Sequence, residues 1–211
     1  AHKNTWSLVQ DTAWDGYEEV PLNIMKGYWT QIHEITEQII SSNVDVVFLQ
    51  AGVGSWAASI TSYIMIFWKN SPIIITVEPL SANCVYRSMK NGQRVSVNNN
   101  KNTIMAGLDC GTVSKIAWEV LKNYVHYSLA ISDEYAKRAM RLLAYPIEDD
   151  KVIIAGESGA GGMAGLLALH ENKIDIGKRI LTSVTTALII NTEGDTDPHS
   201  YNKIVSMENE K

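Results

Sequence analysis

Short apolar runs alternate with longer, more polar segments along most of this chain. Five runs rich in β-branched residues predict strands, at residues 7–11, 44–50, 73–79, 151–157 and 187–193. Their apolar residues follow one another without polar alternation, which is typical of parallel strands that are covered on both faces.

Helices are predicted between these strands, at residues 21–42, 55–69, 114–124, 132–143 and 159–171. The first of them repeats its apolar side chains with a period near that of an α-helix, and the second is apolar almost throughout and should be buried. Strands that alternate with helices predict an α/β fold in three layers, with a mostly parallel twisted sheet flanked by helices. No linker divides the chain, so a single domain is expected.

Composition narrows the range of functions. The chain has 211 residues, of which 45% are hydrophobic and 19% charged, and its formal net charge is −5. An acidic chain of this kind suggests neither nucleic acid nor an anionic membrane as a partner. The apolar stretch 59–68 is shorter than the roughly 20 residues that span a bilayer, and residues 1–10 lack the apolar core of a signal peptide. We therefore expect a cytoplasmic protein.

Cysteine and histidine give little sign of metal chemistry. Cys84 and Cys110 fit no zinc pattern, and no two of the five histidines have the spacing of metal ligands. We expect no metal site. The two cysteines are read either as free thiols in a reduced compartment or as one structural disulfide.

A glycine-bearing turn follows the predicted strand 44–50. Its residues are Ala51, Gly52, Val53, Gly54 and Ser55. Such a turn, opening a helix, directs backbone N–H groups and the positive end of the helix dipole at a ligand, which suits a phosphate ester. The turn meets neither the dinucleotide fingerprint nor the P-loop pattern, and a tight turn with no ligand is the alternative.

Two later turns resemble the first in position. Residues 156–162 follow the predicted strand 151–157 and contain four glycines, and residues 191–197 follow the last predicted strand. Parallel strands present their carboxyl ends at one edge of the sheet, where ligands bind in open α/β folds. We therefore expect the three turns to line one crevice, with Ser158 on its wall.

Read together, these segments resemble the fold-type II pyridoxal-phosphate enzymes, the tryptophan synthase β-like group, and within it the diaminopropionate ammonia-lyases. The resemblance lies in VQDTAWDGYEEVP, LQAGVGSWA, VEPLSANCVYRS, NTIMAGLDCG, GESGAGG and NTEGDTD, which keep their order over nearly the whole chain. It implies the cofactor pyridoxal 5'-phosphate and an amino-acid substrate, 2,3-diaminopropionate, converted to pyruvate and two ammonia by α,β-elimination. It also implies a homodimer.

The resemblance assigns roles to individual positions. The residues Ala51 to Ser55 would hold the cofactor phosphate through backbone amides, and Asp11 would bind an amino group of the substrate. Asn191 and Thr192 end the last predicted strand, where this group places a hydroxyl facing the pyridine nitrogen. The family tends to have Ser at position 191, so the asparagine here shifts that contact towards Thr192.

The largest departure from the family pattern is a missing lysine. The Schiff-base lysine of the family lies in a segment that reads like Asn-Ala-Phe-Lys, and these 211 residues contain no such segment. Lys26 and Lys101 lack its context. We therefore expect no catalytic lysine here: residues 1–211 would be the C-terminal large-domain portion of an incomplete fold, inactive without an N-terminal half as partner.

Two alternatives remain open from the sequence. One is a related pyridoxal-phosphate enzyme that acts on serine or threonine, such as a dehydratase. The other is a truncated fragment without catalytic function, which would expose apolar surface where the rest of the fold docks.

Overall fold

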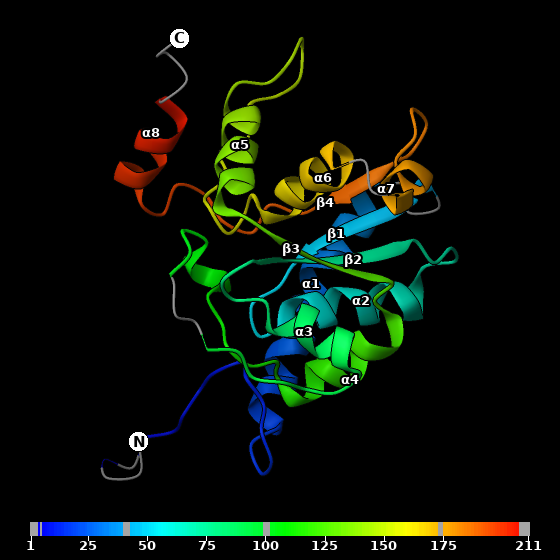
Figure 1. Ribbon diagram of the computed structural model, residues 1–211. Coiled ribbons are helices and arrows are strands. Elements are labelled where there is room, and N and C mark those ends of the chain that lie inside the picture. Colours follow the sequence, from blue (N-terminus) through cyan, green and yellow to red (C-terminus); the bar gives the residue numbers. More distant parts are fainter. Residues whose placement is uncertain (1–3, 5, 40–42, 99–101, 173–174, 207–211) are drawn as a thin grey trace.

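The computed structural model describes residue 4 and residues 6–39, 43–98, 102–172 and 175–206. At its centre is a four-stranded parallel sheet with the strand order β3-β2-β1-β4 (Figure 1). The strands are β1 (Val46–Gln50), β2 (Ile73–Pro79), β3 (Tyr127–Ile131) and β4 (Ala187–Ile189).

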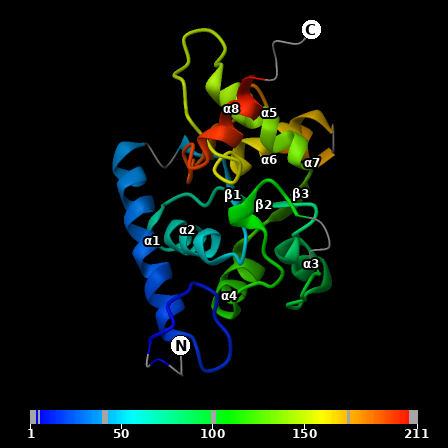
Figure 2. The same cartoon turned by 90° about the vertical axis from the view of Figure 1, so that its left-hand side faces the viewer.

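Helices cover the sheet on both sides and give the three layers that the sequence predicts (Figures 1 and 2). One side carries α1 (Glu19–Gln38), α2 (Ser55–Phe67), α3 (Cys84–Asn91) and α4 (Lys115–Tyr124). The other carries α5 (Asp133–Ala144), α6 (Gly161–Glu171), α7 (Asp175–Ile180) and α8 (Pro198–Ser206). The 3-10 turn η3 (Ala106–Leu108) precedes α4. The five predicted helices correspond to α1, α2, α4, α5 and α6, although residues 40–42 of the first prediction lie outside the described residues.

Successive side chains of β1 enter two different cores. Val47 and Leu49 pack in a cluster with α1, α2 and α4, whereas Val46 and Phe48 pack in a second cluster with α5 and α6. All four side chains are fully buried. An uninterrupted apolar run is therefore what a strand covered on both faces requires, and the prediction for β1 is confirmed.

Two of the predicted strands are wrong. Residues 7–11 form no strand and are mostly exposed. The Tyr17 hydroxyl accepts from the Gln10 amide and donates to the Leu8 carbonyl. Residues 151–157 pair with no strand in the described part of the chain, and Ile153 donates instead to the carbonyl of Leu143. The β-branched residues Val152 to Ile154 form their backbone hydrogen bonds outside the sheet, and their side chains are exposed.

One strand was not predicted. β3 lies at an edge of the sheet and is only half-buried along most of its length. Its sequence, YSLAI, mixes polar and apolar residues and therefore lacks the continuous apolar run that marks β1 and β2.

The structure also decides between the two readings of the cysteines. Cys84 is a buried free thiol and Cys110 a partly buried one. Among the described residues, no helix is both long and apolar enough to cross a bilayer.

Candidate functional site

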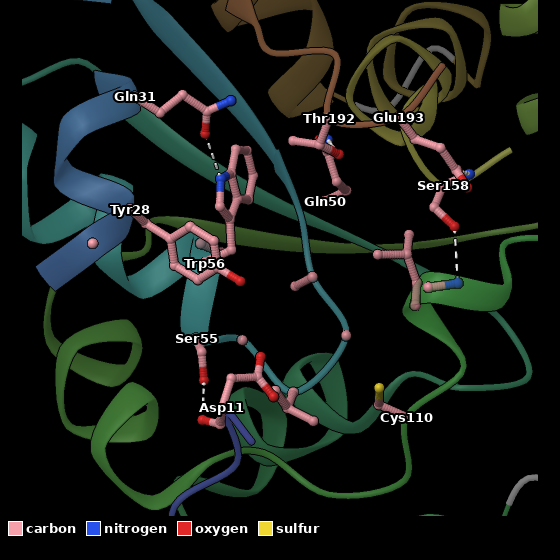
Figure 3. A pocket seen from close by; sticks show the side chains of 18 of the residues that line it. Asp11, Tyr28, Gln31, Gln50, Ser55, Trp56, Cys110, Ser158, Thr192 and Glu193 are labelled. Atoms are coloured by element: carbon pink, nitrogen blue, oxygen red, sulfur yellow. Dashed lines mark hydrogen bonds between the residues drawn. The ribbon is translucent and has the colours of Figure 1, made fainter. Parts of the chain in front are cut away.

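A cavity of about 960 Å³ opens beyond the carboxyl ends of β1 and β4 (Figure 3). Its walls come from α1, from the turn between β1 and α2, from the segment around η3 and from the segment after β4. The edge of a parallel sheet where the strands end is the usual ligand-binding place of open α/β folds, and this volume suits a small molecule.

The turn between β1 and α2 strongly favours its glycines. Gly54 has φ +87°, in the left-handed region, and a Cβ there would approach Leu121 Cδ1 to 2.8 Å. A Cβ on Gly52 would lie 2.9 Å from Cys110 Sγ. The chain thus reverses in little space, with α4 on one side and the η3 segment on the other.

This turn lines the cavity and has free backbone donors. The amides of Gly52, Gly54 and Ser55 donate to no acceptor within the described part of the chain. α2 begins at Ser55, so its positive dipole end points the same way. The Ser55 hydroxyl donates to the Asp11 carbonyl at 2.8 Å, which leaves the backbone amides as the donors for an anionic group.

Asp11 reaches the cavity from a segment that is not a strand. Its carbonyl also receives the Ser114 hydroxyl at 3.4 Å, while the Ala13 amide donates to Ser114 Oγ at 2.9 Å. The Ala13 carbonyl in turn accepts from the Lys115 amide at 3.0 Å. These bonds to the start of α4 fix the segment, and Asp11 lies beside the glycine turn on the cavity wall (Figure 3).

The two residues predicted at the end of the last strand are placed differently. Thr192 lines the cavity, and its Oγ1 accepts a hydrogen bond from Gln50 Nε2 at 2.7 Å. Asn191 is outside the cavity lining: its amide donates to the Ile154 carbonyl at 2.8 Å, and its Oδ1 accepts from the Glu193 amide at 3.2 Å. A direct contact with a ligand at this strand end therefore falls to Thr192.

Glu193 is a site residue that the sequence did not reveal. Its Oε2 accepts from the amides of Ser158 and Gly159 at 2.8 and 3.2 Å, and its Oε1 accepts from the Thr196 hydroxyl at 3.0 Å. One carboxylate thus joins the turn 156–162 to the turn 191–197. Ser158 also accepts from the Gly107 amide at 3.0 Å and lines the cavity, as expected.

Two groups that line the cavity, Tyr28 and Cys110, hold their protons more tightly than usual. Burial raises the pKa of Tyr28, and the carboxylate of Asp11 raises it further. Burial likewise raises the pKa of the Cys110 thiol, again with a contribution from Asp11. Within the described part of the chain, no lysine or arginine lines the cavity, and no group of three or more His, Cys, Asp or Glu side chains could hold a metal ion.

Known proteins match almost the whole chain. The diaminopropionate ammonia-lyases of Escherichia coli (strain K12) and Salmonella typhimurium (strain LT2) are 39% and 41% identical to it, over 97% of this chain and 53% of their own. The crystal structure of the E. coli diaminopropionate ammonia lyase in complex with D-serine matches with a TM-score of 0.88 at 38% identity, over 97% of this chain and 52% of that chain. The chain therefore spans about half the length of the curated relatives it matches.

The family match agrees with the geometry of the cavity. Residues 10–186 match the family described as pyridoxal-phosphate dependent enzyme. Its cofactor is a phosphate ester on a planar ring, and free amides at a helix N-terminus with a hydroxyl on the same cavity suit such a group. By sequence and by fold, this chain belongs to the pyridoxal-phosphate-dependent enzyme family.

Proposed function

We propose that this chain is the cofactor-binding portion of a lyase that converts 2,3-diaminopropionate to pyruvate and two ammonia. One observation carries the proposal: the free amides of the turn 51–55, the Asp11 carboxylate and the Thr192 hydroxyl line a single cavity. The 39–41% identity to diaminopropionate ammonia-lyases supports this reaction and this substrate.

Each group has a distinct task. The amides of Gly52, Gly54 and Ser55 hold the phosphate, and the hydroxyl of Thr192 contacts the ring nitrogen. Asn191 acts indirectly, because its side chain holds the strand end against residue 154. Asp11 pairs with an amino group of the substrate. When bound, pyridoxal phosphate supplies the electron sink that stabilises negative charge at the substrate's α-carbon.

We place the reactive lysine outside residues 1–211, on an N-terminal partner segment, and these residues form the C-terminal part of the large domain. Lys26 is exposed on α1 and does not line the cavity, although its neighbour Gly27 does. Lys101 lies outside the described residues. On this proposal the chain alone is inactive, and the complete enzyme pairs as a homodimer.

The test is reconstitution. The chain is co-expressed with the lysine-bearing half of the E. coli relative, and pyruvate released from 2,3-diaminopropionate is followed by a coupled assay. We expect pyruvate from the pair and none from the chain alone. A folded, cofactor-loaded pair that releases no pyruvate contradicts the proposed reaction, and pyruvate from the chain alone contradicts the placement of the lysine. A preference for serine or threonine would favour the dehydratase alternative.

A further inference from the structure

Gln50 is the last residue of β1, and it lines the cavity although its side chain is almost wholly buried, at 3% exposure. Its Oε1 is the one fully buried side-chain oxygen or nitrogen without a hydrogen-bond partner among the described residues. An unpaired buried acceptor costs free energy, so other interactions of the Gln50 side chain must hold its amide group in this orientation.

The amide group can point in only one direction. Gln50 Nε2 donates to the Ile190 carbonyl at 2.9 Å and to Thr192 Oγ1 at 2.7 Å. A carbonyl oxygen only accepts, so the atom that faces it must be the NH₂ group. Turning the amide over would bring two oxygens together at hydrogen-bond distance. The Ile190 carbonyl therefore fixes the orientation, and Thr192 receives the second N–H.

The consequence lies in the proton of Thr192. A hydroxyl has one proton to donate and two lone pairs to accept with. Since Thr192 Oγ1 accepts from Gln50, its own proton remains to be donated, and no acceptor for it is found among the described residues. Thr192 lines the cavity, so this proton is available to a bound ligand.

We infer that Gln50 is a positioning residue: it holds Thr192 with its hydroxyl proton free to donate to the nitrogen of a bound pyridine ring. The inference rests on the proposed function, because it takes the ring of pyridoxal phosphate as the occupant. The other titratable groups of the cavity are Asp11, Tyr28, Glu34, Cys110 and Glu193. Both oxygens of Glu193, the nearest in sequence, accept other hydrogen bonds.

The probe is 4-deoxypyridoxine 5'-phosphate labelled with ¹⁵N in the ring. It has no aldehyde and therefore needs no lysine to bind. The ¹⁵N chemical shift of the bound ring reports directly whether the nitrogen is protonated. With the unmodified chain at neutral pH, we expect the signal of an unprotonated nitrogen that accepts a hydrogen bond.

The decisive variant is Gln50→Glu, which keeps the shape of the side chain. If the new carboxyl is protonated, its proton goes to the Ile190 carbonyl, and the oxygen facing Thr192 can only accept. If it is ionised, both oxygens only accept. In either state the Thr192 proton turns towards position 50 and a lone pair faces the ring. We expect the nitrogen to gain a proton, with a large upfield shift of its ¹⁵N signal.

A matched control separates this effect from added charge. Gln31 also lines the cavity, and its Oε1 accepts from Trp56 Nε1 at 2.8 Å. Gln31→Glu brings the same new carboxyl group into the cavity without touching Thr192, and we expect it to leave the ring nitrogen unprotonated. Equal upfield shifts in both variants would overturn the inference.

The remaining outcomes are also decisive. If the unmodified chain binds the probe with a protonated nitrogen, the inference fails and the proposed function survives. If it binds no probe at all, both fail. If Gln50→Glu does not fold, Thr192→Val decides: a small downfield shift, from the loss of a donated hydrogen bond, supports the inference. A shift as large as full deprotonation shows that Thr192 had been the acceptor.

Discussion

The side chain of Glu78, at the end of β2, caps the start of α3 by accepting the Val85 amide at 2.7 Å on Oε1. Its Oε2 accepts the Tyr86 amide at 2.6 Å. These amides lie in the first turn of a helix whose own N-cap residue, Asn83, makes no side-chain capping bond. Glu78 is fully buried, so a carboxyl group shielded from solvent links the end of β2 to the start of α3.

This carboxyl group makes the stability of the protein depend on pH. Burial raises the pKa of Glu78 from 4.5 to about 8, against the opposing effect of the two amides. Between these values the folded state holds a proton that the unfolded state has lost. The free energy of unfolding therefore falls as pH rises through this window, by as much as roughly 5 kcal/mol, and is level above it.

Glu78→Gln tests this prediction. Its neutral amide cannot titrate, so the fall in stability between pH 4.5 and 8 should largely disappear. At the acid end the variant should be less stable by about 1–3 kcal/mol, because its NH₂ group faces a backbone N–H. Urea unfolding across this pH range measures both effects. Glu119→Gln, at an exposed position on α4, is the control, and parallel curves for the unmodified chain and Glu78→Gln would contradict the assignment.

Ser114 should decide whether the segment carrying Asp11 is ordered. Ser114→Ala leaves the buried Ala13 amide without an acceptor, a loss of about 1–3 kcal/mol. Hydrogen exchange should show faster exchange of residues 10–14, with little change in the strands. Thr112→Val, which removes an exposed hydroxyl bonded to Ser96, should have no such effect. Unchanged protection of the Ala13 amide in Ser114→Ala would show that other contacts hold the segment.

The sequence predicts the buried part of this fold better than its edges. β1 and β2 are recognisable because burial on both faces favours a continuous apolar run, which Gln50, Thr76 and Glu78 interrupt only in part. The run Val152 to Ile154 has a similar composition but is exposed. Its backbone forms hydrogen bonds with residues 143 and 191 in place of the hydrogen bonds to a neighbouring strand. Composition alone cannot distinguish these two ways of satisfying the backbone.

The site divides in the same way. The glycine turn is recognisable because its φ angle and its close packing exclude other residues locally. Gln50 and Glu193 are not, because their roles depend on partners that are distant in sequence or in another turn. Gln50 bonds Thr192 across 142 positions, and Glu193 bonds Ser158 across 35. Only the folded chain brings these groups together.

Asp11 should discriminate between substrates, if the proposed function holds. Asp11→Asn removes the carboxylate but leaves the backbone carbonyl that accepts from Ser55 and Ser114, so the segment should stay folded. In the reconstituted enzyme, kcat/KM for diamino or D-configured substrates should fall by about 10–100-fold, and that for L-serine far less. Asp15→Asn, exposed and paired with Lys115, is the control. Equal losses for both kinds of substrate would contradict this role.

Alanine substitutions at three glycines should distinguish the effects of backbone strain and of steric clash on stability. Gly16 has φ +84° with nothing within 4 Å of an added Cβ, whereas Gly54 has a similar φ and meets Leu121. Gly16→Ala should therefore cost about 1–3 kcal/mol from strain alone, and Gly54→Ala about 1–3 kcal/mol more from overpacking. Gly27, on α1 at the cavity wall, has a helical φ and open space. Gly27→Ala should stabilise the chain by roughly 0.5–1 kcal/mol.

Two of these variants, Gly54→Ala and Gly16→Ala, test the phosphate cradle. Because a Cβ at position 54 strains the left-handed backbone of the turn and clashes with Leu121 Cδ1, Gly54→Ala should lose affinity for 4-deoxypyridoxine 5'-phosphate by more than about tenfold, which is 1.4 kcal/mol. Gly16→Ala should bind as the unmodified chain does, because Gly16 lies outside the cavity lining. Calorimetric titration measures the affinities and urea unfolding the stabilities. If folded Gly54→Ala binds the probe as tightly as Gly16→Ala does, the amides of this turn do not hold the phosphate.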